Sequence, residues 1–152
     1  MTAILDELRA RLVADGVGVA GPSTSTTSIF VDSLPEWAGV SLVLSLAPGA
    51  PGDRKYGQGV PGIERPRVEV FARSTAPAGG QVAHSTGAKA AATAAYRSLV
   101  SIANENIAAS TSATPTFWLS VDSINGPPDL FDRDPTGRIY FRASLQCDRE
   151  ST

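Results

Sequence analysis

The stretch GRIYFRASLQCDRE, from Gly137 to Glu150, decides the fold of this chain. Its alternate residues are apolar, namely Ile139, Phe141, Ala143, Leu145 and Cys147. This alternation predicts a β-strand with one face in a hydrophobic core, because successive side chains of a strand point to opposite faces of its sheet. The other face offers charges and hydrogen bonds to water or to a partner chain through Arg138, Tyr140, Arg142, Ser144, Gln146 and Asp148.

A second segment, RPRVEVFARS from Arg65 to Ser74, repeats this pattern. One face carries Val68, Val70 and Ala72, and the other carries Arg67, Glu69, Phe71 and Arg73. The chain therefore places its polar groups on sheet faces and not in a cluster of reactive residues. This arrangement favours assembly or binding over catalysis.

The remaining apolar patterns predict two helices and three further strands. A helix is expected over residues 2–15, with an apolar stripe of Ile4, Leu5, Leu8, Leu12 and Val13 and a stop at Gly16. An alanine-rich helix is expected over residues 81–107, with a buried stripe of Ala88, Ala92, Ala95, Leu99 and Ile102. Strands are expected at SIFVDSL, from Ser28; at Val40 to Ala47, with Val40, Leu42, Leu44 and Leu46 inward; and at TFWLSVDSI, with Phe117, Leu119 and Val121 inward and Trp118 on the other face.

These elements predict an α+β fold in a single domain over residues 1–152. Its sheet is expected to be mostly antiparallel or mixed, with four to five strands packed against two helices in the order α-β-β-β-α-β-β. A chain of 152 residues with 42% apolar content is large enough for one hydrophobic core and too small for two well-packed ones.

Two connections between these elements are rich in glycine and proline. The segment 48–66 surrounds Arg54, Lys55 and Tyr56 with such residues, which predicts a long, flexible, exposed loop suited to assembly on a partner surface. A tolerated surface insertion is the plain alternative. The segment NGPPDLFDRDPTG, residues 125–137, is expected to be a turn-rich connection.

No residue pattern indicates an enzyme, a metal site or a cofactor. His84 is the single histidine and Cys147 the single cysteine, and the inward position of Cys147 predicts an inert buried thiol. Asp129, Asp132 and Asp134 lie close together, but they lack the spacing and the final bidentate glutamate of a calcium loop. We therefore expect no catalytic, cofactor-binding or metal-binding residues.

Charge and hydropathy exclude two further classes. The formal net charge of −2 argues against a protein that mainly grips nucleic acid, since that task requires a basic surface. No apolar run is long enough to span a bilayer, and the charged N-terminal segment is unlike a signal peptide. The sequence thus predicts a soluble protein made in a cytoplasm, with no membrane partner.

Four segments in this order resemble the tail terminator family of long-tailed bacteriophages, which are minor capsid proteins that join the tail to the head. They are ILDELRARLVADGVG near the N-terminus, IFVDSLPE followed by an apolar strand, ERPRVEVFAR, and the closing GPPDLFDRDPTGRIYFRASLQC. The resemblance covers most of the chain and depends on the order and spacing of the segments. The linker 20–27 and the loop 47–62 are longer and richer in glycine and proline than the family pattern.

The resemblance implies a homo-oligomeric ring, expected to be a hexamer, at the head-to-tail joining region of a virion assembled in the bacterial host cytoplasm. Such a ring caps the tail tube, terminates tail elongation and contacts the tail tube protein and a head stopper or connector protein, while genome DNA passes through it without sequence-specific binding. A head-completion stopper, a tail tube subunit and a small-molecule-binding α+β domain, with a cavity lined by Phe117, Leu119, Phe141 and Leu145, are the alternatives. The residues expected at a subunit or partner interface are Arg54, Lys55, Tyr56, Arg65, Trp118, Arg133, Tyr140 and Arg142.

Overall fold

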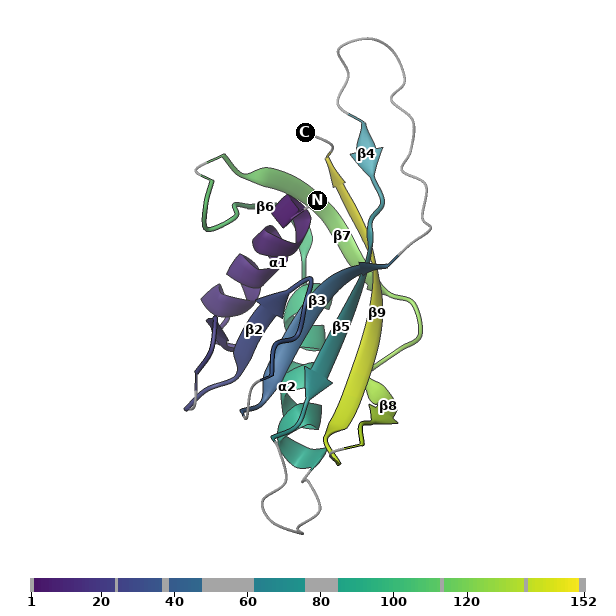
Figure 1. The fold of residues 1–152 in the computed structure, drawn as a ribbon. Coiled ribbons are helices and arrows are strands. Elements are labelled where there is room, and N and C mark those ends of the chain that lie inside the picture. Colours follow the sequence, from purple (N-terminus) through teal and green to yellow (C-terminus); the bar gives the residue numbers. More distant parts are fainter. Residues whose placement is uncertain are drawn as a thin grey trace.

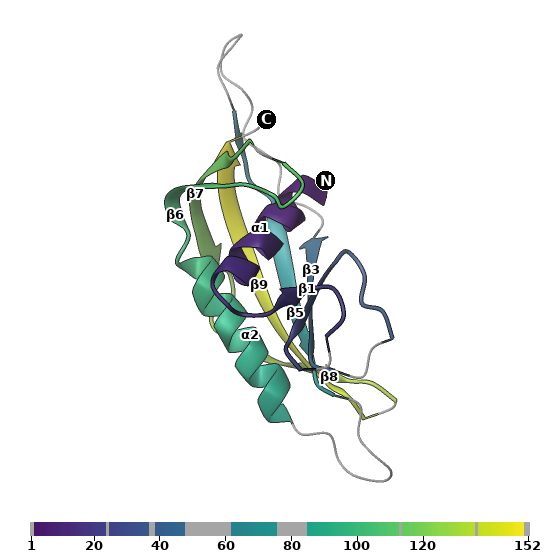
Figure 2. The same ribbon diagram turned by 90° about the vertical axis from the view of Figure 1, so that its left-hand side faces the viewer.

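The fold is an α+β arrangement in which one large curled sheet carries both helices on the same face (Figures 1 and 2). It is seen in a computed structural model that describes residues 2–23, 25–36, 39–47, 62–75, 85–112, 114–135 and 137–150. The elements are α1 (Thr2–Ala14), β1 (Val19–Ala20), β2 (Ser28–Val31), β3 (Ser41–Ala47), β4 (Ile63–Glu64), β5 (Arg67–Arg73), α2 (Ser85–Val100), β6 (Ala103–Ile107), β7 (Thr116–Ser123), β8 (Asp129–Arg133) and β9 (Ile139–Glu150).

The sheet is mixed, as predicted, but it is larger than the expected four to five strands. Nine strands are found in the described residues, in the order β1-β2-β3-β5-β9-β7-β6, with β4 and β8 also paired to β9. The pairs β1–β2 and β2–β3 are parallel, and the other pairs are antiparallel. The unexpected strands β1, β4, β6 and β8 are two to five residues long. Strands this short carry too little alternation to be recognised, since main-chain pairing and not a buried face holds them in the sheet.

Strand β9 is the centre of the sheet, and its predicted inward face is confirmed, whereas Ser144 on the predicted outward face is also buried. Its five predicted inward residues are all buried, and so are Val68, Val70 and Ala72 of β5. The register brings the two sets together, with Val70 opposite Ala143 and Ala72 opposite Phe141. In β3, Leu42 and Leu44 are buried as expected, whereas Leu46 near the strand end is 39% exposed.

Helix α1 packs on the sheet through Leu5, Leu8 and Leu12, which are fully buried. Val13 was expected in this buried stripe, but its side chain is 40% exposed. The helix stops where the glycine predicts. Gly16 has a φ of 74°, and the backbone N–H of Val17 donates to the carbonyl of Leu12 across the turn (3.0 Å). This is a Schellman ending, for which glycine is favoured because it adopts positive φ without strain.

Helix α2 is shorter than predicted, since it ends at Val100 and not at residue 107. The expected stripe of Ala88, Ala92, Ala95 and Leu99 is buried against the sheet, whereas Ile102 is buried just beyond the helix. The chain then turns, with Asn104 at a φ of 50°, and residues 103–107 form β6 against β7. Cross-strand hydrogen bonds with β7 thus outweigh the local preference for helix, and residues 81–84 lie outside the described part of the chain.

Cys147 lies on the inner face of β9 and is fully buried, which confirms its predicted position. Burial raises the pKa of its thiol to about 12, chiefly because the thiolate would lose its hydration. We expect iodoacetamide at about pH 8 to leave the folded protein unmodified, since only the thiolate reacts. Mass spectrometry should find the alkylated cysteine only after unfolding in guanidinium. Rapid labelling of the native protein would contradict this position.

Candidate assembly surface

The residues predicted to lie at an interface fall into three groups. Arg54, Lys55 and Tyr56 lie outside the described residues, together with most of the loop 48–66. Trp118, the second group, is buried. The third group is at least partly exposed and consists of Arg65, Arg133, Tyr140 and Arg142. The end of that loop is not irregular, because Ile63–Glu64 pairs with β9 as β4.

The prediction that Trp118 faces outward is wrong, because its side chain is fully buried. The pairing of β7 with β9 shifts register between Trp118 and Ser120. As a result Trp118 lies opposite Arg149, and Val121 lies opposite Cys147, so both face the core although they are three residues apart. A bulge of this kind inserts one extra residue into the strand, so that the inward and outward positions beyond it are exchanged. Phe117 and Leu119, expected inward, are only half-buried.

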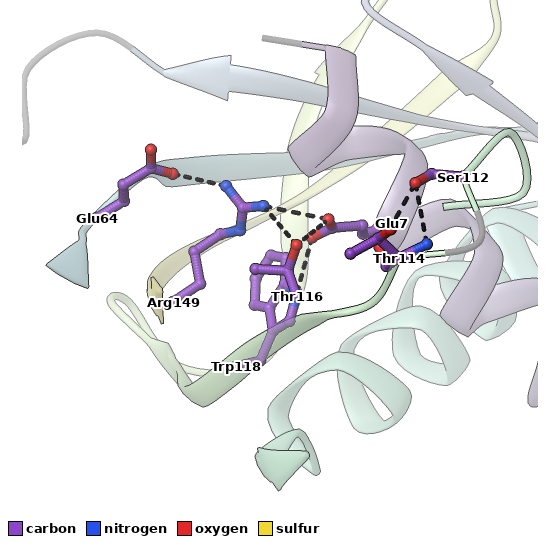
Figure 3. Close-up of polar contacts among 7 residues, drawn as sticks. All are labelled: Glu7, Glu64, Ser112, Thr114, Thr116, Trp118 and Arg149. Atoms are coloured by element: carbon purple, nitrogen blue, oxygen red, sulfur yellow. Dashed lines mark hydrogen bonds and ion pairs between the residues drawn. The ribbon is translucent and has the colours of Figure 1, made fainter. Parts of the chain in front are cut away.

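Trp118 belongs to a buried polar network at one end of the sheet (Figure 3). Its indole Nε1 donates to Glu7 Oε2 at 2.9 Å, and Thr116 Oγ1 donates to Glu7 Oε1 at 2.7 Å. Arg149 Nη2 donates to the same Oε1 at 3.1 Å, and Nη1 donates to Glu64 Oε2 at 2.6 Å. The network joins α1, β7, β9 and β4, and both Glu7 and Arg149 are about 95% buried or more.

Sequence reasoning missed Glu7 and Arg149, although each carried a signal. Arg149 follows Cys147 by two residues and so occupies an inward position of the last strand. Glu7 lies beside Leu8 on the apolar side of the first helix. Opposite charges on the buried faces of two elements indicate an internal ion pair, since a buried charge without a partner is costly.

The face of the sheet away from the helices, called here the outer face, carries a row of apolar and aromatic side chains. The register aligns Phe30 with Val43, Val43 with Phe71, and Phe71 with Arg142 across four neighbouring strands. The row continues to Phe131 on β8, whose ring lies 5.4 Å from that of Phe71 in an edge-to-face arrangement. The guanidinium of Arg142 stacks 4.4 Å from the Phe131 ring centre. These contacts fix Phe131 in place.

Strand β8, residues 129–133, forms an exposed arm along the edge of β9 and corrects the expectation of an irregular turn. All five of its residues are exposed. Leu130 is 62% exposed and Phe131 is 47% exposed, on a strand whose pairing contains a register shift between Leu130 and Asp132. An adjacent pair of large apolar side chains this open to solvent is typical of a surface that contacts another chain.

Three predicted interface residues come together at this β8 arm, and one does not. Arg133 is the last residue of the arm, while Tyr140 and Arg142 lie on the adjoining part of β9 and are half-buried. Arg65 lies at the other end of β9, where its Nε is 3.5 Å from Asp148 Oδ1. The arm and its neighbours are therefore the candidate site, and Arg65 stands apart from it.

The acidic residues near the β8 arm are engaged in holding the backbone. Asp132 Oδ1 accepts the backbone N–H of Arg133 at 2.7 Å, and Asp134 Oδ1 accepts that of Arg138 at 2.9 Å. Asp134 Oδ2 also accepts the Tyr140 hydroxyl at 3.3 Å. Within the described ranges, no group of three or more His, Cys, Asp or Glu side chains could hold a metal ion.

Two of the four residues expected to line a ligand cavity belong to the packed protein core. Leu145 is fully buried and Phe141 is 7% exposed, and both pack in one cluster with the buried residues of α1 and α2. An open hollow of about 280 Å³ lies elsewhere, lined by Ser25, Thr26, Thr27, Gly39, Val40 and Thr75. It shares none of the four residues expected to line a ligand cavity.

The described helices contain no segment that is both long and apolar enough to cross a membrane. No protein-family model matches the chain, and no curated protein matches it. Among solved structures, the chain is similar to a chain of one described as the virion of a native gene transfer agent particle. The two are 18% identical with a TM-score of 0.49, over 99% of this chain and 93% of that chain. A likeness of this size assigns neither a family nor a function.

Proposed function

We propose that this chain is a structural protein of a phage-like virion that closes the tail tube as a ring and joins the tail to the head. The observation that carries the proposal is the β8 arm, which displays Leu130 and Phe131 to solvent while Phe71 and Arg142 hold Phe131 in position. A preformed exposed apolar strand suits contact with another protein chain, because little ordering entropy is lost when it docks. The order of the four sequence segments that resemble tail terminators supports the same role.

Deletion of the gene from its phage-like element tests this proposal, with electron microscopy of the particles as the readout. We expect overlong tails and separate DNA-filled heads, because nothing would stop tube growth or bridge the two parts. Purified protein added to such a lysate should restore joining. Normal tails beside emptied heads would indicate a head-completion stopper, and absent tails would indicate a tube subunit. Intact infectious particles would overturn a virion role.

A further inference from the structure

We propose that the β8 arm of one copy docks on the exposed face of helix α2 in a second copy, so that the copies join head to tail. This contact deepens the ring proposed above and rests on it. It commits the arm to one partner, a second copy of this chain. The argument follows from charge, size and spacing on the two surfaces.

The β8 arm presents Phe131 and two carboxylates on the outer face, while Leu130 lies on the other side of the strand, opposite Phe141. Leu130 and Phe131 are exposed, and Asp129 and Asp132 flank them in the sequence Asp-Leu-Phe-Asp. Neither carboxylate forms an ion pair with any described residue. Among the described strands, β8 pairs with β9 alone, which leaves its other edge open to a neighbouring molecule.

The exposed face of α2 has the opposite charge and small side chains. We call Lys89, Ala90, Ala94 and Arg97 the α2 basic face, and all four are exposed. The helix contains no acidic residue, and within the described part of the chain neither Lys89 nor Arg97 has an ion-pair partner. Side chains as short as alanine would let large apolar groups of a partner approach the helix closely.

The two charges on each surface are separated by distances that the long, flexible side chains of Lys89 and Arg97 can bridge. Lys89 and Arg97 are eight residues apart, which corresponds to about 12 Å along a helix. Asp129 and Asp132 lie opposite Arg142 and Tyr140, which are two residues apart on β9, and this corresponds to about 7 Å along a strand. Two ion pairs can therefore form at the ends of the contact while Phe131, on the same outer face as the aspartates, covers the alanines between them.

The positions of the two surfaces suit a ring and not a symmetric dimer. Figure 2 shows α2 to the left of the sheet and β8 toward the right, in the lower half of the molecule. A contact between two different surfaces is heterologous, and repeated copies of it give a closed ring or an open filament according to the rotation between neighbours.

Paired charge reversals test this contact in the full-length protein. The first variant carries Asp129→Lys and Asp132→Lys, and the second carries Lys89→Glu and Arg97→Glu. Each should self-associate at least about tenfold more weakly than the parent, because like charges would then face each other. An equal mixture should regain association, since each arm again meets a helix of opposite charge. Sedimentation velocity at low salt measures all three, and thermal melts check that each variant folds.

Two controls separate this contact from the proposed function. Asp122→Lys changes the charge of an exposed residue on β7 and should leave association unchanged. Phe131→Ser should also weaken association, and mixing this variant with the first charge-reversed variant should not restore it. The arm-to-helix contact would be overturned if both charge-reversed variants self-associated as strongly as the parent. It would also be overturned if the parent and the mixture both stayed monomeric at high concentration. Neither result would bear on tail closure, whereas failed tail joining by a self-associating parent would overturn only the proposed function.

Discussion

Replacing Glu7 by alanine is expected to lower the free energy of unfolding by about 3 to 5 kcal/mol, as is usual when one partner of a buried ion pair is removed. The carboxylate accepts hydrogen bonds from Arg149, Thr116 and Trp118, and all three would lose the acceptor that Glu7 provides. The Arg149 charge would then stay buried at 3% side-chain exposure, and among the described residues its remaining counterion would be the partly exposed Glu64. Chemical denaturation followed by circular dichroism measures the change.

The neighbouring residue offers a matched control. Asp6 forms an ion pair with Arg9 at 2.8 Å, but both side chains are partly exposed, so Asp6→Ala should cost less than about 1 kcal/mol. The double variant Glu7→Leu with Arg149→Met should recover much of the loss, since apolar groups of similar volume need no counterion. Equal losses for Glu7→Ala and Asp6→Ala would show that the network contributes little to stability.

Leu145→Ala is expected to destabilise the protein by about 2 to 5 kcal/mol, because it removes buried methyl groups and leaves a cavity in close-packed surroundings. Leu145 is fully buried at the centre of β9, opposite Val68 of β5. Phe141→Ala should cost a similar amount. The measurement is the denaturation midpoint at constant m-value.

The adjacent residue Gln146 serves as the control for Leu145. Its side chain lies on the outer face, and its Nε2 donates to the carbonyl of Arg65 at 3.1 Å in an exposed position. Gln146→Ala should therefore cost little. A larger loss for Gln146→Ala than for Leu145→Ala would shift the inward face of β9 by one residue.

Long segments with a regular spacing of apolar residues were predictable, because this spacing reflects one buried face over many residues. In β9 and β5 the predicted inward side chains are buried, although Ser144 and Arg73, predicted on the outward faces, are buried as well. In α1 the residues Leu5, Leu8 and Leu12 are buried. Gly16 ends α1 for a local reason, since few other residues adopt its positive φ without strain. Each of these features follows from interactions within a single segment of the chain.

The candidate site depended on contacts between segments, which no local pattern records. The exposed β8 arm is a strand because β9 supplies its hydrogen bonds, although its own residues resemble a turn. Phe131 gains its position from Phe71, sixty residues earlier in the chain. Trp118 turns inward because pairing with β9 introduces a bulge.

By itself, the sequence determined the α+β class, the central strand β9 with its inward face, and the helical stripe of α1, because hydrophobic periodicity within one segment specifies these features. The tertiary structure alone decided the number of strands, the early end of α2, and the burial of Glu7 with Arg149. The physical reason is that main-chain pairing and ion pairing depend on a partner that the fold brings from far along the chain, and such a partner can override the local preference of a short segment.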